Sequence, residues 1–186
     1  MLFLSSVDLK VPLNYQLPDY PTGCESVATV NAMSYYRSVD VDDFINRLPK
    51  ESIYKEGVFH EAFLGDPSSV SGIMCYEEPV EEVVRSYDGF DYLNLTGESF
   101  DKVMSRVCAG RPVVIWLTNG YVEPRDTSLG YKTPTHTVVI SGVDLDSSSL
   151  VITDSLYGVV YKDVSEIEDL YYKCGSHAFE VVYKGD

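Results

Sequence analysis

A cysteine that follows a glycine, at the expected start of a helix, is the residue of this chain best suited to nucleophilic chemistry. Residues 21–25 read Pro-Thr-Gly-Cys-Glu, and the Thr-x-x-Glu spacing predicts a capping box with Thr22 as the N-cap. The apolar residues that follow predict a helix over 22–37, so Cys24 would lie in its first turn. There, unpaired N–H groups and the helix dipole favour thiolate over thiol. Gly23 would leave room for a substrate carbonyl. A buried structural cysteine is an equally good interpretation of this local pattern alone.

A thiolate nucleophile needs a nearby base, and the chain offers three histidines, at positions 60, 136 and 177. His60 falls in an irregular segment and is expected to be a surface residue. His177 opens the last expected strand and could be satisfied there as an edge residue. His136 is different, because a polar loop over 119–135 delivers it to the first position of an apolar strand. The sequence therefore favours His136 as the base that activates Cys24.

Asp154 is the acidic residue that the pattern brings near His136. Two β-branched runs, 137–143 and 150–153, flank a polar turn and predict an antiparallel hairpin. Asp154 ends the second strand, so it should meet His136 at the open end of the hairpin. A carboxylate there could accept the imidazole N–H and hold the tautomer that a base requires. Alone, this residue would be interpreted as a turn-forming aspartate.

Three further residues are candidates for contacts with a substrate. Gln16 lies eight residues before Cys24, and its side-chain amide could stabilise an oxyanion together with the backbone N–H of Cys24. Any surface glutamine would look the same. Tyr15 and Trp116 could line the substrate groove by their positions. Trp116 could equally be a core residue.

The elements that must position these groups follow an α+β order, with helices first and strands later. Helices are expected over 22–37, 40–48, from Pro79 onward, 96–109 and 165–172. Strands are expected over 113–118, 137–143, 150–153, 158–161 and 178–183. Residues 50–72 show no periodicity and predict a long surface loop. We therefore expect amino-terminal helices packed on an antiparallel β-sheet.

The charge of the chain argues against two classes of partner. The formal net charge at pH 7 is −15, from 14 basic and 29 acidic residues. Such a surface repels phosphate backbones and anionic headgroups, so we expect neither nucleic acid nor a membrane surface as partner. A neutral or basic peptide would be attracted, although the acidity could serve solubility alone. The pattern makes no prediction about the oligomeric state.

The spacing of the cysteines and the amino-terminal segment bear on the cellular compartment of the protein. Cysteines stand at positions 24, 75, 108 and 174 and match no paired C-x-x-C zinc pattern. They could form two disulfides in an oxidising compartment, although Cys108 falls on an apolar helix face. No run approaches membrane-spanning length. We expect a cytoplasmic protein if Met1 is the native start, and a secreted, extracellular one if a signal peptide was removed.

Taken together, these segments resemble the C39-like cysteine peptidases of bacteria. The matching segments are Val11-Pro-Leu-Asn-Tyr-Gln16, Pro21-Thr-Gly-Cys24-Glu25, Gly110-Arg-Pro-Val-Val-Ile-Trp116, His136-Thr-Val-Val139, Val151-Ile-Thr-Asp154 and Tyr157-Gly158. They run over nearly the whole chain in the papain-like order of Cys, His and Asp. One departure is Ser155, where the family often has proline.

The resemblance implies a single C39-like peptidase domain over 1–186 with a papain-like fold. It also implies that Cys24 is the nucleophile, His136 the base, Asp154 the orienting acid and Gln16 the oxyanion-hole residue. The reaction would be hydrolysis of a peptide or amide bond through a thioester, without a metal or organic cofactor. Three alternatives stay open: an amidase or peptidyl transferase on the same triad, an idle peptide-binding module, and a disulfide-stabilised structural domain.

Overall fold

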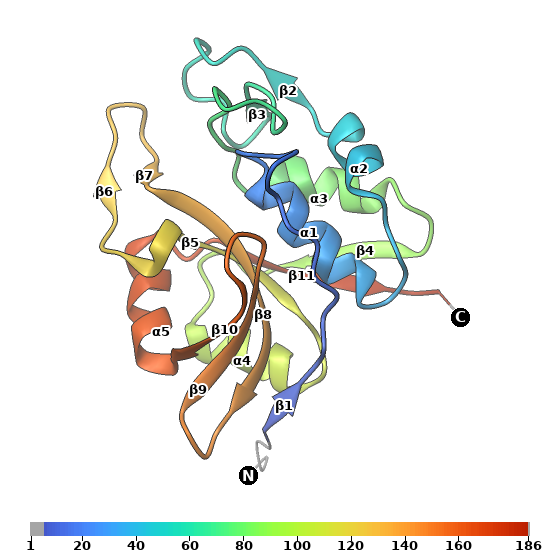
Figure 1. The fold of residues 1–186 in the computed structure, drawn as a ribbon, viewed down its shortest axis with the longest axis vertical. Helices are drawn as coiled ribbons and strands as arrows, with labels where there is room; N and C mark the ends of the chain where they lie inside the picture. The colour runs from blue at the N-terminus through green and yellow to red at the C-terminus, as the bar shows by residue number, and fades with distance from the viewer. Residues whose placement is uncertain (1–5, 186) are drawn as a thin grey trace.

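The computed structural model describes residues 6–185 and is built around one antiparallel sheet (Figure 1). Over these residues the sheet has seven strands in the order β10-β9-β8-β5-β11-β4, with β1 paired to β8. These strands are β1 (Val7–Asp8), β4 (Phe90–Asn94), β5 (Val113–Thr118), β8 (Thr135–Asp144), β9 (Ser149–Asp154), β10 (Gly158–Asp163) and β11 (Ala178–Tyr183). The predicted α+β fold with an antiparallel sheet is confirmed.

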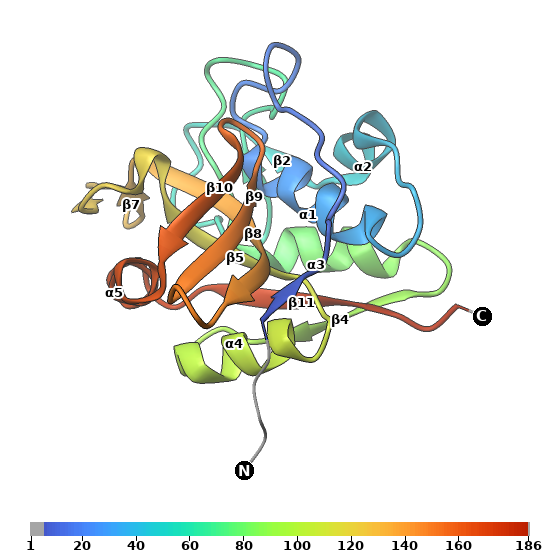
Figure 2. The ribbon, with the colours of Figure 1, turned by 60° about the horizontal axis from the view of Figure 1, so that its bottom comes forward.

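Helices cover both faces of this sheet (Figure 2), and the sheet separates the hydrophobic core into two layers. The helices are α1 (Cys24–Ser34), α2 (Val41–Arg47), α3 (Glu77–Arg85), α4 (Phe100–Cys108) and α5 (Val164–Lys173). Helices α1, α2 and α3 pack against one face of the sheet. Helices α4 and α5 pack against the other face. The central strands therefore lie between two hydrophobic layers.

Strand β5 shows how the sequence produces this layering. Its side chains alternate between the two faces, as in any strand. Val114 and Trp116 enter the layer beneath α1, α2 and α3. Val113, Ile115 and Leu117 enter the layer beneath α4 and α5. Because both faces are covered, the strand reads as a continuous apolar run rather than as an alternation. The neighbouring strand β8, which carries His136, pairs with β5 in the middle of the same sheet.

Helix α1 begins later and ends earlier than the expected range of 22–37, and its predicted capping box is wrong. The N-cap is Gly23, and no side chain caps the helix. The hydroxyl of Thr22 instead donates to the carbonyl of Ser69 at 2.9 Å. Glu25 does not reach back to the N-cap, because its side chain is buried inside the protein. The Thr-x-x-Glu spacing is present, but the side chains of Thr22 and Glu25 form hydrogen bonds with distant segments instead.

The other predicted helices and strands are present with shifts of a few residues, whereas β4 is not among the expected strands. Helix α2 is capped by Asp40, whose carboxylate accepts the N–H of Asp43 at 2.9 Å. Helix α4 is capped by Ser99, so it starts later than the expected residue 96. The segment 50–72 holds two short parallel strands, β2 (Lys50–Glu51) and β3 (Phe63–Leu64). The loop before His136 contains the 3₁₀ turn η1 (Asn119–Tyr121) and a small hairpin of β6 (Arg125–Asp126) and β7 (Lys132–Thr133).

Candidate active site

Cys24 is the first residue of α1, at the end of the helix whose N–H groups lack helical partners. Its side chain is only 6% exposed, and its thiol donates to Oε2 of Glu25 at 3.3 Å. Burial raises the pKa of the thiol well above its ordinary value, and the charge of Glu25 raises it further. The lowered pKa that the helix end predicts is therefore not found in this arrangement. Burial and the adjacent carboxylate outweigh the helix dipole here.

His136 and Asp154 form the buried pair that the sequence predicts. The ring nitrogen Nε2 of His136 lies 2.9 Å from Oδ1 of Asp154. Because a carboxylate can only accept, Nε2 carries the proton of this bond. The Asp154 carboxylate also accepts the hydroxyl of Tyr121 at 2.6 Å and the N–H of Leu156 at 2.8 Å. Burial by itself would raise the pKa of Asp154, but these bonds outweigh it and hold the pKa below its ordinary value.

The second ring nitrogen of His136 is left available on the same strand against which Cys24 lies. Nδ1 is buried and has no hydrogen-bond partner among residues 6–185. The sulfur of Cys24 lies beside the N–H and hydroxyl of Thr137, the next residue along β8. Within the described part of the chain, no hydrogen bond joins this sulfur to the imidazole. The structure thus places the Cys24 sulfur beside the residue that follows His136, with the thiol turned onto Glu25.

Gln16 links the segment before Cys24 to the segment after Asp154. Its side chain is buried and donates through Nε2 to the carbonyl of Pro21 at 3.3 Å. Its Oε1 accepts the hydroxyl of Ser155 at 2.7 Å. Ser155, the departure from the family pattern, thus anchors this glutamine. An amide nitrogen has two protons, so one donor of Gln16 remains for another acceptor.

Three residues are candidates for lining the substrate site, namely Tyr15, Trp116 and Gly23, and their surroundings differ. Tyr15 is 59% exposed, as a groove residue could be. Trp116 is 2% exposed and donates its indole N–H to the carbonyl of Cys75 at 3.0 Å, which favours the core alternative. Gly23 is tightly packed, because an added Cβ would lie 3.0 Å from Cβ of Tyr20. A side chain at this position would therefore require its neighbours to shift.

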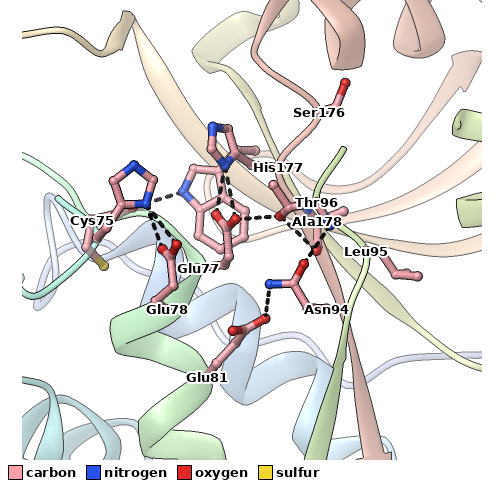
Figure 3. A network of polar contacts seen from close by, with 12 residues as sticks. Cys75, Glu77, Glu78, Glu81, Asn94, Leu95, Thr96, Ser176, His177 and Ala178 are labelled. Carbon is pink, nitrogen blue, oxygen red and sulfur yellow. Dashed lines mark hydrogen bonds and ion pairs between the residues drawn. The ribbon is translucent and has the colours of Figure 1, made fainter. Parts of the chain in front are cut away.

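The two other histidines each contact a glutamate of α3, and His177 is seen in the polar network of Figure 3. Nδ1 of His60 lies 2.9 Å from the carboxylate of Glu78, and more than half of the His60 side chain is exposed, as expected. Nδ1 of His177 lies 2.8 Å from Oε2 of the buried Glu77. The ring of Tyr76 stacks between the two imidazoles, with centroid distances of 4.6 and 4.1 Å. Each of these histidines is thus bonded to a glutamate of its own.

Three general features bear on the chemistry that the site can carry. All four cysteines are free. Among residues 6–185, no group of three or more histidine, cysteine or acidic side chains is placed to hold a metal ion. In the same range, no helix combines the length and apolar character needed to cross a bilayer.

A cysteine that begins a helix packed on an antiparallel sheet, together with a buried histidine–aspartate pair on that sheet, defines the papain-like class of cysteine peptidase folds. The chain belongs to the Peptidase C39-like family, whose model matches residues 8–179. The resemblance drawn from the sequence is thereby confirmed.

Solved structures agree with this assignment. A crystal structure of a Bacillus anthracis protein classed as a C39-like peptidase is 26% identical, covers 98% of this chain and 100% of its own, and superposes with a TM-score of 0.84. A double glycine motif protease from an AMS/PCAT transporter, solved with its leader peptide, is 15% identical over 96% of this chain and 94% of its own, with a TM-score of 0.54. At that identity the likeness shows the fold alone.

Among curated proteins, YvpB of Bacillus subtilis strain 168 is 26% identical over 129 residues, and its function is uncharacterised. The match covers 67% of this chain and 51% of YvpB. The chain therefore spans about half the length of this curated relative.

Proposed function

We propose that this protein is a cysteine peptidase that cleaves a peptide or amide bond through a thioester acyl-enzyme. The observation that carries the proposal is the buried pair of His136 and Asp154. The imidazole nitrogen Nδ1 of His136 has no hydrogen-bond partner among the described residues. A buried nitrogen without a partner costs free energy, so it usually has a reason to be retained. A base that receives a thiol proton during catalysis is such a reason.

In the first half of the reaction, the Cys24 side chain would turn from Glu25 to Nδ1 of His136 and transfer its proton there. The thiolate would attack the carbonyl carbon of the substrate, forming a carbon–sulfur bond. The oxyanion would be held by the backbone N–H of Cys24 and by the spare amide proton of Gln16. The protonated His136 would then donate its proton to the leaving amine as the carbon–nitrogen bond breaks.

In the second half, water would hydrolyse the thioester with His136 again as the base. Asp154 would keep the proton on Nε2 throughout, so that Nδ1 exchanges protons with sulfur and substrate. Tyr121 supports this role because its hydroxyl bonds to the same carboxylate. The side chains alone can supply every proton transfer in this scheme.

The substrate class that fits best is a neutral or basic peptide. The net charge of −15 attracts cationic segments and repels anionic ones. The exposed Tyr15 lies one residue before Gln16 and could contact such a peptide beside the oxyanion site.

A peptide library tests the proposal directly. Wild-type protein would be incubated with unstructured peptides of varied charge between pH 5 and 9, and new termini would be identified by mass spectrometry. Cleavage should disappear in Cys24→Ala and persist in Cys108→Ala, which removes a free cysteine on α4 outside the site. Addition of a free amine would divert the acyl group if the enzyme is a transferase. Cleavage that survives Cys24→Ala, or a library left intact by the wild type, would refute the proposal.

A peptide-binding module with an idle triad is the second candidate. The observation that favours it is the hydrogen bond between the Cys24 thiol and Glu25, where an active enzyme would have a bond to His136. Such a module should bind the same peptides equally well as wild type and as Cys24→Ala, without turnover in either. Fluorescence anisotropy of a labelled peptide, measured with the cleavage assay, separates the two functions.

A further inference from the structure

Glu25 is a buried acid in direct contact with the proposed nucleophile. It is the second residue of α1 and is fully buried. Its Oε2 accepts the thiol of Cys24, and its Oε1 accepts the backbone N–H of Cys75, both at 3.3 Å. A carboxylate in such a place needs compensation, because burial penalises its charge. Two neutral donors are modest compensation.

The surroundings of Glu25 contain thiols rather than cations. The titratable groups that face it are Cys24 on its own helix and Cys75 on the segment leading into α3. On β8, the polar neighbour of the Cys24 sulfur is Thr137, next to His136. Among residues 6–185, Glu25 forms no ion pair with a lysine, arginine or histidine. Burial accordingly raises the pKa of Glu25 to about 7.

We propose that Glu25 is a positioning residue that holds the Cys24 thiol protonated and turned away from His136, and that catalysis requires its release. The inference rests on the proposed role of Cys24 as nucleophile. A thiol has one proton, so it cannot donate to Glu25 and to Nδ1 of His136 at the same time.

The charge of Glu25 and its hydrogen bonds can be separated by one substitution. Glu25→Gln retains an oxygen that can accept the Cys75 N–H, so a purely structural role would survive it. It removes the negative charge that opposes thiolate formation beside it. A charge at this distance typically moves a pKa by about one unit or more.

The experiment is the pH profile of Cys24 alkylation by iodoacetamide, followed on the Cys24 peptide by mass spectrometry. In Glu25→Gln the midpoint should move to lower pH by about one unit. At pH 8 the rate should rise roughly three- to tenfold, because the tenfold gain in thiolate is partly offset by its lower nucleophilicity.

Glu81→Gln is the matched control. Glu81 is another buried carboxyl whose pKa burial raises to about 7, but its partner is Asn94 at 3.0 Å rather than a cysteine (Figure 3). Its substitution should leave the Cys24 profile unchanged. A Glu25→Gln profile that coincides with those of the wild type and Glu81→Gln, in a variant with wild-type melting temperature, would overturn the inference.

A second measurement applies if Glu25→Gln does not fold. In Cys24→Ala, the titration of Glu25, followed by NMR of ¹³C-labelled glutamate, should move to higher pH. In the wild type the thiol donor lowers the pKa of Glu25, and the substitution removes that donor. An unchanged Glu25 titration would overturn the inference by itself. A shifted alkylation profile in a protein that cleaves no peptide would instead refute only the proposed function. Peptide cleavage with an unshifted profile would refute only the role of Glu25.

Discussion

Asp154 carries a buried negative charge on which the orientation of His136 depends, and replacing it by asparagine isolates that charge. The carboxylate is fully buried and accepts from His136, Tyr121, Leu156 and Tyr157. In Asp154→Asn the remaining oxygen can keep the bonds at the Oδ1 position. The new NH₂ group faces the hydroxyl of Tyr121, which can rotate and accept. The substitution therefore removes charge while preserving most of the hydrogen-bond geometry.

The magnitude follows from exchanging charge-assisted bonds for neutral ones. A hydrogen bond to a charged group contributes about 1.5–3 kcal/mol and a neutral one about 0.5–1.5 kcal/mol. Two side-chain bonds, from His136 and Tyr121, change from the first class to the second. We expect the free energy of unfolding at pH 7 to fall by about 2–3 kcal/mol.

The direction of the Asp154 pKa shift decides how the stability deficit of Asp154→Asn should change with pH. The pKa of Asp154 in the folded protein is below its ordinary value. Its stabilisation is therefore fully present above the unfolded pKa of about 3.9, and it is lost as the pH falls through the folded pKa. Asp154→Asn has no such group, so its deficit against the wild type should be largest near neutrality and should shrink in acid.

Urea unfolding of both proteins at intervals from pH 7 down to pH 2.5 measures this difference. Asp163→Asn is the control, because that aspartate is also held below its ordinary pKa but by the exposed N-cap bonds of α5. Its deficit should be smaller, because the carboxylate is exposed and asparagine caps a helix about as well as aspartate. A deficit for Asp154→Asn that is constant across the pH range would refute the assignment of the stabilisation to this buried charge.

Three further predictions concern the groups around the proposed triad and a helix that packs on the sheet. Gln16→Ala should lower kcat by about 10²-fold or more with a smaller change in KM, as expected when an oxyanion donor is lost, and steady-state kinetics on a cleaved peptide checks this. Tyr121→Phe should destabilise the protein by about 1–3 kcal/mol, because it removes one donor to Asp154, and urea unfolding at pH 7 would show it. Ser99→Ala should cost about 1 kcal/mol in the same assay, because the Ser99 hydroxyl caps α4 through the N–H of Lys102.

The parts of the fold that sequence could predict are those governed by local pattern. The sequence predicts the strand over 113–118 with its limits, because five buried apolar residues and Thr118 lie between Pro112 and a polar loop. The hairpin that carries His136 and Asp154 was found because a polar turn separates two β-branched runs. Strand β4 was missed, since its sequence Phe-Asp-Tyr-Leu-Asn carries two polar residues and lies at the edge of the sheet.

The parts that sequence could not predict depend on contacts between distant segments. Nothing in the pattern indicates that Tyr121 bonds to Asp154, because 33 positions separate them. The Thr-x-x-Glu motif at 22–25 gave a local explanation for Glu25, whereas the structure bonds this side chain to Cys75, 50 positions away. Local rules assume a solvent-exposed helix end, and here the end is buried. The same burial reversed the expected direction of the Cys24 pKa.

The two buried carboxyl groups of the proposed site, Asp154 and Glu25, thus have opposite environments. Asp154 receives four donors, including an imidazole, and its pKa lies below the ordinary value. Glu25 receives only neutral donors, and burial raises its pKa to about 7. Environments that separate the pKa values of two acids in this way usually assign them different roles. In this site the ionised Asp154 would stabilise the imidazolium of His136 and so favour transfer of the thiol proton to Nδ1. Glu25 would retain that proton on sulfur, and the balance between the two acids would decide when Cys24 becomes a nucleophile.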